Sequence, residues 1–179
     1  MAVALITLTA MVKTGGLLKA MPMLKWLCLS VFVIVFDQLT KFWVMANFDL
    51  YDSIALLPSV NLTYVHNTGA AFSFLSSADG WQRWFLAAIA LIATIVLTVW
   101  LSRLKRDERW MAVTLSLILG GAVGNLYDRM SYGYVIDFID VFYKTWHWPV
   151  FNVADSAISV GVVMMLIDAF RGDKSAATE

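Results

Sequence analysis

Charged residues are scarce in this chain, and so are the residues that build disulfides and metal sites. Only 15% of its 179 residues are Asp, Glu, Lys or Arg, whereas 60% are hydrophobic, and it has one cysteine and two histidines. A single cysteine, Cys28, excludes an internal disulfide and a zinc site built on several cysteines. The net charge of zero, without a continuous basic stripe, argues against a nucleic-acid partner. This hydrophobic fraction exceeds what a soluble core can bury, so we predict an integral membrane protein.

Four hydrophobic runs have the length needed to cross a bilayer. A helix rises 1.5 Å per residue, so about 20 residues cross a hydrocarbon core of roughly 30 Å. Tryptophans open three of the runs and stand shortly before the fourth, as expected for rings that settle among lipid headgroups. We therefore predict an all-α integral membrane protein, a four-transmembrane-helix bundle with spans at about 26–46, 84–101, 110–126 and 154–170.

The distribution of lysine and arginine predicts how the chain is oriented. Basic residues close to helix ends are retained in the cytoplasm. They cluster before the first span, between the second and third spans, and after the fourth span. The other side carries only Arg83, Arg129 and Lys144, although its loops are longer. Both termini are therefore expected in the cytoplasm.

The two outer loops differ in pattern. Residues 54–74 alternate apolar and polar side chains with Pro, Asn and Gly between them, which predicts a small antiparallel sheet at the outer surface. Residues 128–150 are rich in aromatic side chains, so we expect this loop to rest in the membrane interface. The predicted organisation is a leader whose status the sequence leaves open, a single transmembrane domain and a cytoplasmic tail, at residues 1–22, 23–171 and 172–179.

The first span contains a carboxylate and an ammonium where hydrocarbon is expected. Asp37 lies about 16 Å along the helix from the inner interface, and Lys41 follows at i+4. At this spacing the two groups share one helix face and can form an ion pair. We interpret Asp37 and Lys41 as a self-neutralising structural pair that anchors this helix.

Small and polar residues line the third span at helical spacing. Gly121, Asn125 and Asp128 stand at i, i+4 and i+7, so they share one stripe, while Gly120 and Gly124 form a neighbouring small-xxx-small face. One face permits close helix packing, and the other points polar groups inward. The stripe is explained equally well as a capping and interface cluster or as part of a functional site.

A second polar stripe begins the fourth span, where Asn152, Asp155 and Ser159 stand at i, i+3 and i+7. An acid about one turn inside the membrane surface is expected to face the bundle or a wet cavity. A carboxylate there can also cap the helix, but Asn152 is already a good capping residue. Asp155 is therefore predicted to be surplus to the structural need of the helix.

The inventory of reactive residues favours carboxylate chemistry. The sequence has no His-Glu-x-x-His motif and no Gly-x-Ser-x-Gly elbow, and Lys41 and Lys144 have no serine at an obvious spacing. Two aspartates at a low-dielectric site share one proton, so one activates water while the other polarises a carbonyl. Such a pair needs no metal and no cofactor. Spacing does not choose among the outer-side acids, which are Asp128, Asp137, Asp140 and Asp155.

Five short motifs, each weak alone, follow one another along the chain. They are Asp37-Gln-Leu-Thr-Lys41, Asn67-Thr-Gly-Ala-Ala-Phe72, Gly124-Asn-Leu-Tyr-Asp-Arg129, Val135-Ile-Asp-Phe138 and Phe151-Asn-Val-Ala-Asp155. In this order, on a chain with four predicted spans, they resemble the lipoprotein signal peptidase family, also called signal peptidase II or prolipoprotein signal peptidase. The resemblance extends from Met23 to Arg171.

The resemblance implies an aspartyl protease whose catalytic pair is Asp137 and Asp155. It leaves Asp140 as a loop carboxylate. By position, it implies that six residues line or support the site: Asn67, Gly121, Asn125, Arg129, Asn152 and Ala154. It also implies a structural role for three polar residues: Asp37, Lys41 and Asp128.

The implied reaction is cleavage of a lipoprotein precursor just before its diacylglyceryl-modified cysteine. The implied partners are lipid-modified prolipoproteins and membrane lipids, with no nucleic acid, and we expect a monomer. The implied location is the bacterial inner membrane, with the active site at the periplasmic side. That depth suits the substrate, because the apolar region of a signal peptide ends near the outer surface.

Two other functions are compatible with acids in a membrane protein. A proton-coupled small membrane carrier is the main alternative, because intramembrane acids such as Asp37 often mark ion pathways. It predicts acids near the midplane and often an inverted repeat, whereas most acids here gather at the outer rim and no repeat is evident. A non-enzymatic scaffold predicts that Asp137→Asn and Asp155→Asn keep their function.

Overall fold

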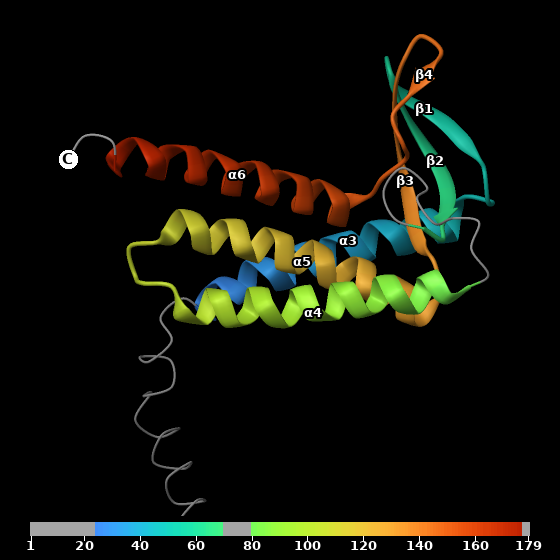
Figure 1. Cartoon of the computed structure of the whole chain (residues 1–179). Coiled ribbons are helices and arrows are strands. Elements are labelled where there is room, and N and C mark those ends of the chain that lie inside the picture. Colours follow the sequence, from blue (N-terminus) through green and yellow to red (C-terminus); the bar gives the residue numbers. More distant parts are fainter. Residues whose placement is uncertain (1–23, 70–79, 177–179) are drawn as a thin grey trace, which may run out of the picture.

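The computed structural model describes residues 24–69 and 80–176, and four long helices dominate it (Figure 1). Each has a stretch of at least 18 residues apolar enough to cross a membrane, so the predicted four-helix membrane bundle is confirmed. The predicted leader and the motif residues Ala70–Phe72 lie outside the described residues. The helices are α3 (Leu27–Asn47, after the short 3-10 helix η1, Leu24–Trp26), α4 (Trp81–Arg103), α5 (Arg109–Ser131) and α6 (Val153–Ala176).

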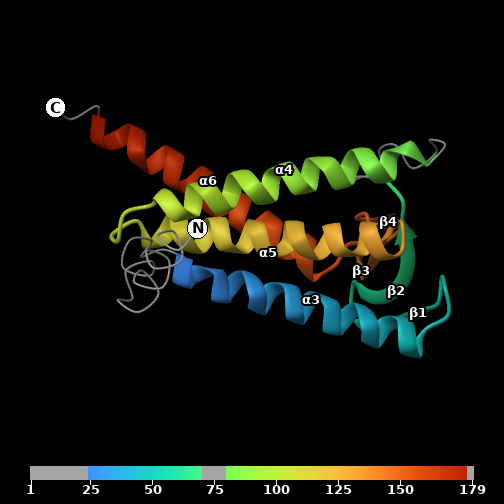
Figure 2. The ribbon, with the colours of Figure 1, turned by 90° about the horizontal axis from the view of Figure 1, so that it is seen from below.

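Helix α5 is the centre of the bundle. It contacts α3, α4 and α6, and it runs between α3 and α4 in Figure 2. Of its membrane-spanning window 56% is buried, against 11–28% for the other three helices. Glycines make this possible: a Cβ at Gly120 would lie 2.7 Å from Cβ of Val33 in α3, and one at Gly121 would collide with the carbonyl oxygen of Ala154 in α6. Gly120, on the predicted small face, therefore allows α3 to approach closely, and Gly121, on the predicted polar stripe, does the same for α6.

A four-stranded antiparallel sheet lies at one end of the bundle (Figure 1). The first outer loop forms two strands, as predicted, but the second also supplies two strands to the same sheet, which the sequence analysis did not predict. The longer of these strands has no alternation of buried and exposed residues to reveal it, and it forms by pairing with a segment that is distant in the sequence. In order across the sheet, the strands are β1 (Ser53–Leu57), β2 (Val60–Asn67), β3 (Val135–Tyr143) and β4 (Trp146–His147).

The pairing of β2 with β3 brings two distant sequence motifs together. Val65 stands opposite Asp137, and Asn67 stands opposite Val135. Because side chains alternate between the faces of a strand, Asn67 and Asp137 point to the same face at neighbouring positions. The sheet therefore fixes one of the expected site motifs against another.

Helix α5 continues to Ser131, beyond the predicted end of the third span at residue 126. The added turn carries Asp128 and Arg129, and charged groups are costly in hydrocarbon. Both have partners inside the protein: Asp128 pairs with Lys41, and Arg129 donates to the carbonyl oxygen of Gly69. The helix can continue through these two residues because groups of the protein, and not water, pair with their charges.

Candidate active site

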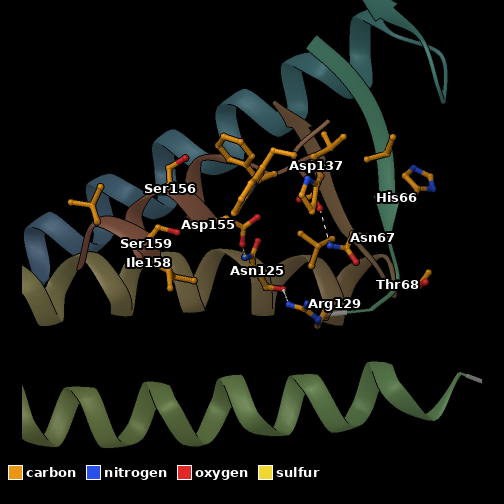
Figure 3. Close-up of a pocket in the computed structure, with 17 residues that line it drawn as sticks. His66, Asn67, Thr68, Asn125, Arg129, Asp137, Asp155, Ser156, Ile158 and Ser159 are labelled. Carbon is orange, nitrogen blue, oxygen red and sulfur yellow. Dashed lines mark hydrogen bonds between the residues drawn. The ribbon is translucent and has the colours of Figure 1, made fainter. Parts of the chain in front are cut away.

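Asp137 in β3 and Asp155 in the first turn of α6 face one cavity (Figure 3). The cavity has a volume of about 780 Å³, and Asn67, Asn125 and Arg129 also line it. Asp137 is only 1% exposed, so its carboxyl group is shielded from bulk solvent. Of the four outer-side acids that the sequence left open, the structure brings this pair to the cavity.

Each carboxylate oxygen of the pair accepts a hydrogen bond from an amide. Asn152 Nδ2 and Asn67 Nδ2 donate to Asp137 Oδ1 and Oδ2, at 2.6 Å and 2.9 Å. Asn125 Nδ2 donates to Asp155 Oδ1 at 2.8 Å, and the backbone N–H of Asn152 donates to Asp155 Oδ2 at 3.3 Å. Asn152 thus binds both acids. These donors are neutral, so they orient the carboxyl groups without cancelling their charge.

Asn152 and Asp155 also form a reciprocal cap at the start of α6. The backbone N–H of Asp155 donates to Asn152 Oδ1 at 2.9 Å, while the Asp155 carboxylate accepts from the backbone of Asn152. This is the arrangement of a capping box. The prediction that Asp155 is surplus to the structural need of the helix was therefore wrong, because the same carboxylate caps the helix and faces the cavity.

Asp137 is set up to hold a proton near neutral pH. Burial, together with the neighbouring charge of Asp155, raises the pKa of Asp137 to about 7, against smaller opposing effects of Asn67, Lys41 and Asn152. Two carboxyl groups that cannot both ionise share one proton and titrate as a pair. The site thus offers one proton donor and one proton acceptor at the same pH.

The predicted ion pair between Asp37 and Lys41 is present, at 2.8 Å, but a third charged group joins it. Lys41 Nζ also lies 2.8 Å from Asp128 Oδ2. The additional partner comes within reach because α3 and α5 pack closely at Gly124, where a Cβ would lie 2.7 Å from Asp37 Oδ2. Gln38, which the sequence analysis did not select, donates to both Asp128 and Asp37, at 2.8 Å and 3.1 Å.

Arg129 supports the site through the chain that follows β2. Its Nη2 donates to the carbonyl oxygen of Gly69 at 3.1 Å, and the N–H of Gly69 donates to Asn67 Oδ1 at 3.0 Å. The amide of Asn67 is thereby oriented with its Nδ2 toward Asp137. Ala154, another expected supporting residue, is fully buried and donates its N–H to Asp37 Oδ1 at 2.9 Å.

The resemblance implied that Asp140 is a loop carboxylate, but the structure places it in a strand. It is 4% exposed in β3 and accepts from Asn61 Nδ2 at 3.0 Å, with His147 Nδ1 2.7 Å away. Asp137 and Asp140 are three residues apart on one strand, so their side chains point to opposite faces of the sheet. This alternation keeps Asp140 away from Asp155.

Parts of the cavity wall escaped the sequence analysis. Val65, Val150 and Ser156 line it, and they reach it only through strand pairing and the turn into α6. No motif spacing marks such residues. Among the described residues, no group of three or more His, Cys, Asp or Glu side chains is arranged to hold a metal ion.

The fold and the cavity define a class, a membrane protein with a shielded carboxyl pair at one end of a four-helix bundle. Residues 29–171 match the family described as signal peptidase (SPase) II. The chain belongs to the signal peptidase II family, and it is therefore a membrane protease.

Similar proteins cover most of the chain. A lipoprotein signal peptidase of Pseudomonas aeruginosa (strain UCBPP-PA14) is 51% identical over 154 residues, 85% of this chain and 91% of the relative. One from Pseudoalteromonas translucida (strain TAC 125) is 54% identical over 150 residues, 84% and 90% of the two chains. The solved structure of a bacterial membrane enzyme, at 2.3 Å resolution, aligns with a TM-score of 0.77 at 32% identity, covering 84% of this chain and 90% of its own.

Proposed function

We propose that this chain is an aspartic endopeptidase that removes signal peptides from diacylglyceryl-modified prolipoproteins, by cleaving before the lipid-modified cysteine. The observation that carries the proposal is that Asp137 and Asp155 face one cavity and are both bound by Asn152. The relatives named lipoprotein signal peptidase support the substrate. Membership of a protease family favours this function over the proton-coupled carrier.

In the proposed reaction, the two acids divide the work of hydrolysis. The ionised carboxylate takes a proton from water, which attacks the scissile carbonyl carbon. The protonated partner donates a hydrogen bond to the carbonyl oxygen and later gives a proton to the leaving amine. The products are a free signal peptide carboxylate and an amino group on the lipid-modified cysteine. Asn125, Asn152 and Asn67 would keep the two acids oriented throughout.

We propose that the sheet and the cavity lie at the periplasmic side of a bacterial inner membrane. The connection between α4 and α5 lies at the opposite end of the bundle (Figure 1) and carries Arg103, Lys105 and Arg106. By the positive-inside rule, that end is cytoplasmic. Both acids come from one chain, which supports a monomer as the working unit. The cavity continues along α6 past Ser159, where an apolar signal peptide can lie beside the helix.

The substrate assignment is tested with purified protein in lipid bilayers and two versions of one precursor. One carries the diacylglyceryl group on its cysteine, and the other has serine in place of that cysteine and no lipid. We expect release of the signal peptide from the first and a rate at least about 100-fold lower for the second, because the lipid fixes the scissile bond at the depth of the acids. Equal rates would contradict a substrate defined by its lipid.

Variants of Asn152 separate helix capping from contact with the acids. Serine keeps a capping oxygen but loses the amide that donates to Asp137, so Asn152→Ser is expected to keep most thermal stability and lose about tenfold in kcat. Asn152→Ala loses the cap as well, at a further cost of about 1 kcal/mol in the free energy of unfolding. Thermal unfolding and precursor cleavage measure the two effects. If Asn152→Ser cleaved at the wild-type rate, the contact with Asp137 would have no role in turnover.

A further inference from the structure

Lys41 uses its whole hydrogen-bonding capacity inside the protein. Its side chain is 1% exposed, and an ammonium has three hydrogens and no acceptor. Three oxygens lie within reach: Asp37 Oδ2 at 2.8 Å, Asp128 Oδ2 at 2.8 Å and Asn125 Oδ1 at 3.0 Å. Neutralising Asp37 requires only the first of these contacts. It does not explain the contacts with Asp128 and Asn125.

Two of these partners hold a backbone amide directly before a site acid. Asp37 Oδ1 accepts from the N–H of Ala154 at 2.9 Å, and Ala154 precedes Asp155. Asp128 Oδ2 accepts from the N–H of Ile136 at 3.2 Å, and Ile136 precedes Asp137 in the chain. The two carboxylates beside Lys41 therefore tether the start of α6 and the start of β3.

The third partner, Asn125, connects Lys41 to the side chain of Asp155. Because an ammonium only donates, it accepts no amide hydrogen, and Asn125 must turn its oxygen toward Lys41. Its Nδ2 then faces Asp155 Oδ1, to which it donates at 2.8 Å. Asn152 Nδ2 also approaches Asn125 Oδ1, at 3.1 Å. This nitrogen has only two hydrogens, however, and a carbonyl oxygen and a carboxylate oxygen are also within its reach. The ammonium is therefore the stronger constraint on Asn125.

We propose that Lys41 is a positioning residue for the reaction, and that through Asp37, Asp128 and Asn125 it sets the separation and orientation of Asp137 and Asp155. This inference rests on the proposed function, since it assigns a role toward the same two acids. It goes beyond neutralisation of charge within the bundle. The three contacts join α3 to the two elements that carry the acids, and α5 supplies two of the intermediaries.

Arginine at this position distinguishes geometry from charge. A guanidinium keeps the positive charge between Asp37 and Asp128, but it is planar and longer and does not reproduce three contacts from one nitrogen. We expect Lys41→Arg to lower kcat about 100-fold and to change KM less than about threefold, because a small misplacement of reacting groups slows the chemical step. A wild-type kcat for Lys41→Arg would overturn the inference.

Ser30→Ala is the matched control. Ser30 is also buried on α3, and its hydroxyl donates to the carbonyl oxygen of Ser116 in α5 at 2.8 Å, at a level of the bundle away from the acids. Its removal weakens the same helix interface without touching the acid pair. We expect a lowered melting temperature with kcat unchanged. A loss of kcat in Ser30→Ala equal to that in Lys41→Arg would show that activity follows bundle stability alone.

The pH profile gives a readout that a loss of bundle stability alone would leave unmoved. The charge of Lys41 lowers the pKa of Asp137, while the neighbouring Asp155 raises it. Lys41→Met is therefore expected to move the alkaline limb of the kcat profile to higher pH. If neither lysine variant folds, Gln38→Ala decides, since Gln38 joins Asp37 to Asp128 without carrying charge. It should lower kcat about fivefold; a wild-type kcat would overturn the inference.

Asp137→Asn and Asp155→Asn, measured in the same assay, keep the two hypotheses apart. If either asparagine variant cleaves the lipid-modified precursor normally, the proposed function fails. If both are inactive while Lys41→Arg matches wild type in kcat and in pH profile, only the positioning role of Lys41 fails.

Discussion

Asp137→Asn and Asp155→Asn are each expected to abolish release of the signal peptide, with kcat at least about 10⁴-fold below wild type. Asparagine has nearly the shape of aspartic acid, but its amide neither takes a proton from water nor donates one to the leaving amine. The expected loss is large because the two acids act as a unit, so the second does not compensate for the first. The effect is measured as the rate at which the free signal peptide is released from the lipid-modified precursor.

The pH dependence of the wild-type enzyme belongs to the same expectation. Because the pKa of Asp137 is raised to about 7, the pair loses its shared proton as the pH rises through that value, and kcat is expected to fall there. The same shift affects stability. Because the pKa of Asp137 is higher in the folded state than the ordinary 3.8, the folded protein holds this proton more tightly than the unfolded chain does. The contribution of Asp137 to stability is therefore complete below pH 3.8 and is lost as the pH rises to about 7.

The asparagine variant at residue 137 provides its own folding control. It has no carboxyl group to ionise, so its unfolding temperature should change less than that of wild type between about pH 5 and pH 8. Inactivity together with this flattened profile would assign the loss to chemistry and not to misfolding. Retained cleavage by either asparagine variant would contradict the assigned pair.

Gly121→Ala is expected to produce the second large effect, because there is no space for a side chain at this position. Its Cβ would collide with the carbonyl oxygen of Ala154 and lie 2.7 Å from Cγ1 of Ile158. The obstacle is backbone in the first turn of α6, so the turn that carries Asp155 must move. We expect a loss of about 1–3 kcal/mol in stability and about 100-fold in kcat.

Gly161→Ala is the matched control for this second prediction. A Cβ at Gly161 would lie 3.0 Å from the carbonyl oxygen of Thr114, in the same interface between α5 and α6 but further from the acids. We expect a similar loss of stability, with kcat within about threefold of wild type, in thermal unfolding and precursor cleavage. Equal losses of activity in the two alanine variants would show that kcat depends on helix packing in general.

The sequence alone was sufficient for the membrane architecture. Bilayer thickness sets the length of each apolar run, and the hydrophobicity of a residue does not depend on its distant neighbours. The packing face of α5 was also predictable, because Gly120 and Gly124 share a stripe at helical spacing. For the acids, the predicted topology left four candidates on the outer side, and the choice of Asp137 and Asp155 came from the family resemblance.

Which side chains meet was decided only by the tertiary structure. Asn67 reaches Asp137 because β2 pairs with β3, and Asp140 is turned away because side chains alternate along a strand. Lys41 gains Asp128 and Asn125 because α3 packs tightly on the glycines of α5. Such contacts depend on the register of strands and the depth of helix packing, which distant segments determine together. Local sequence patterns carry the length and face of each element, but not the partner that it meets.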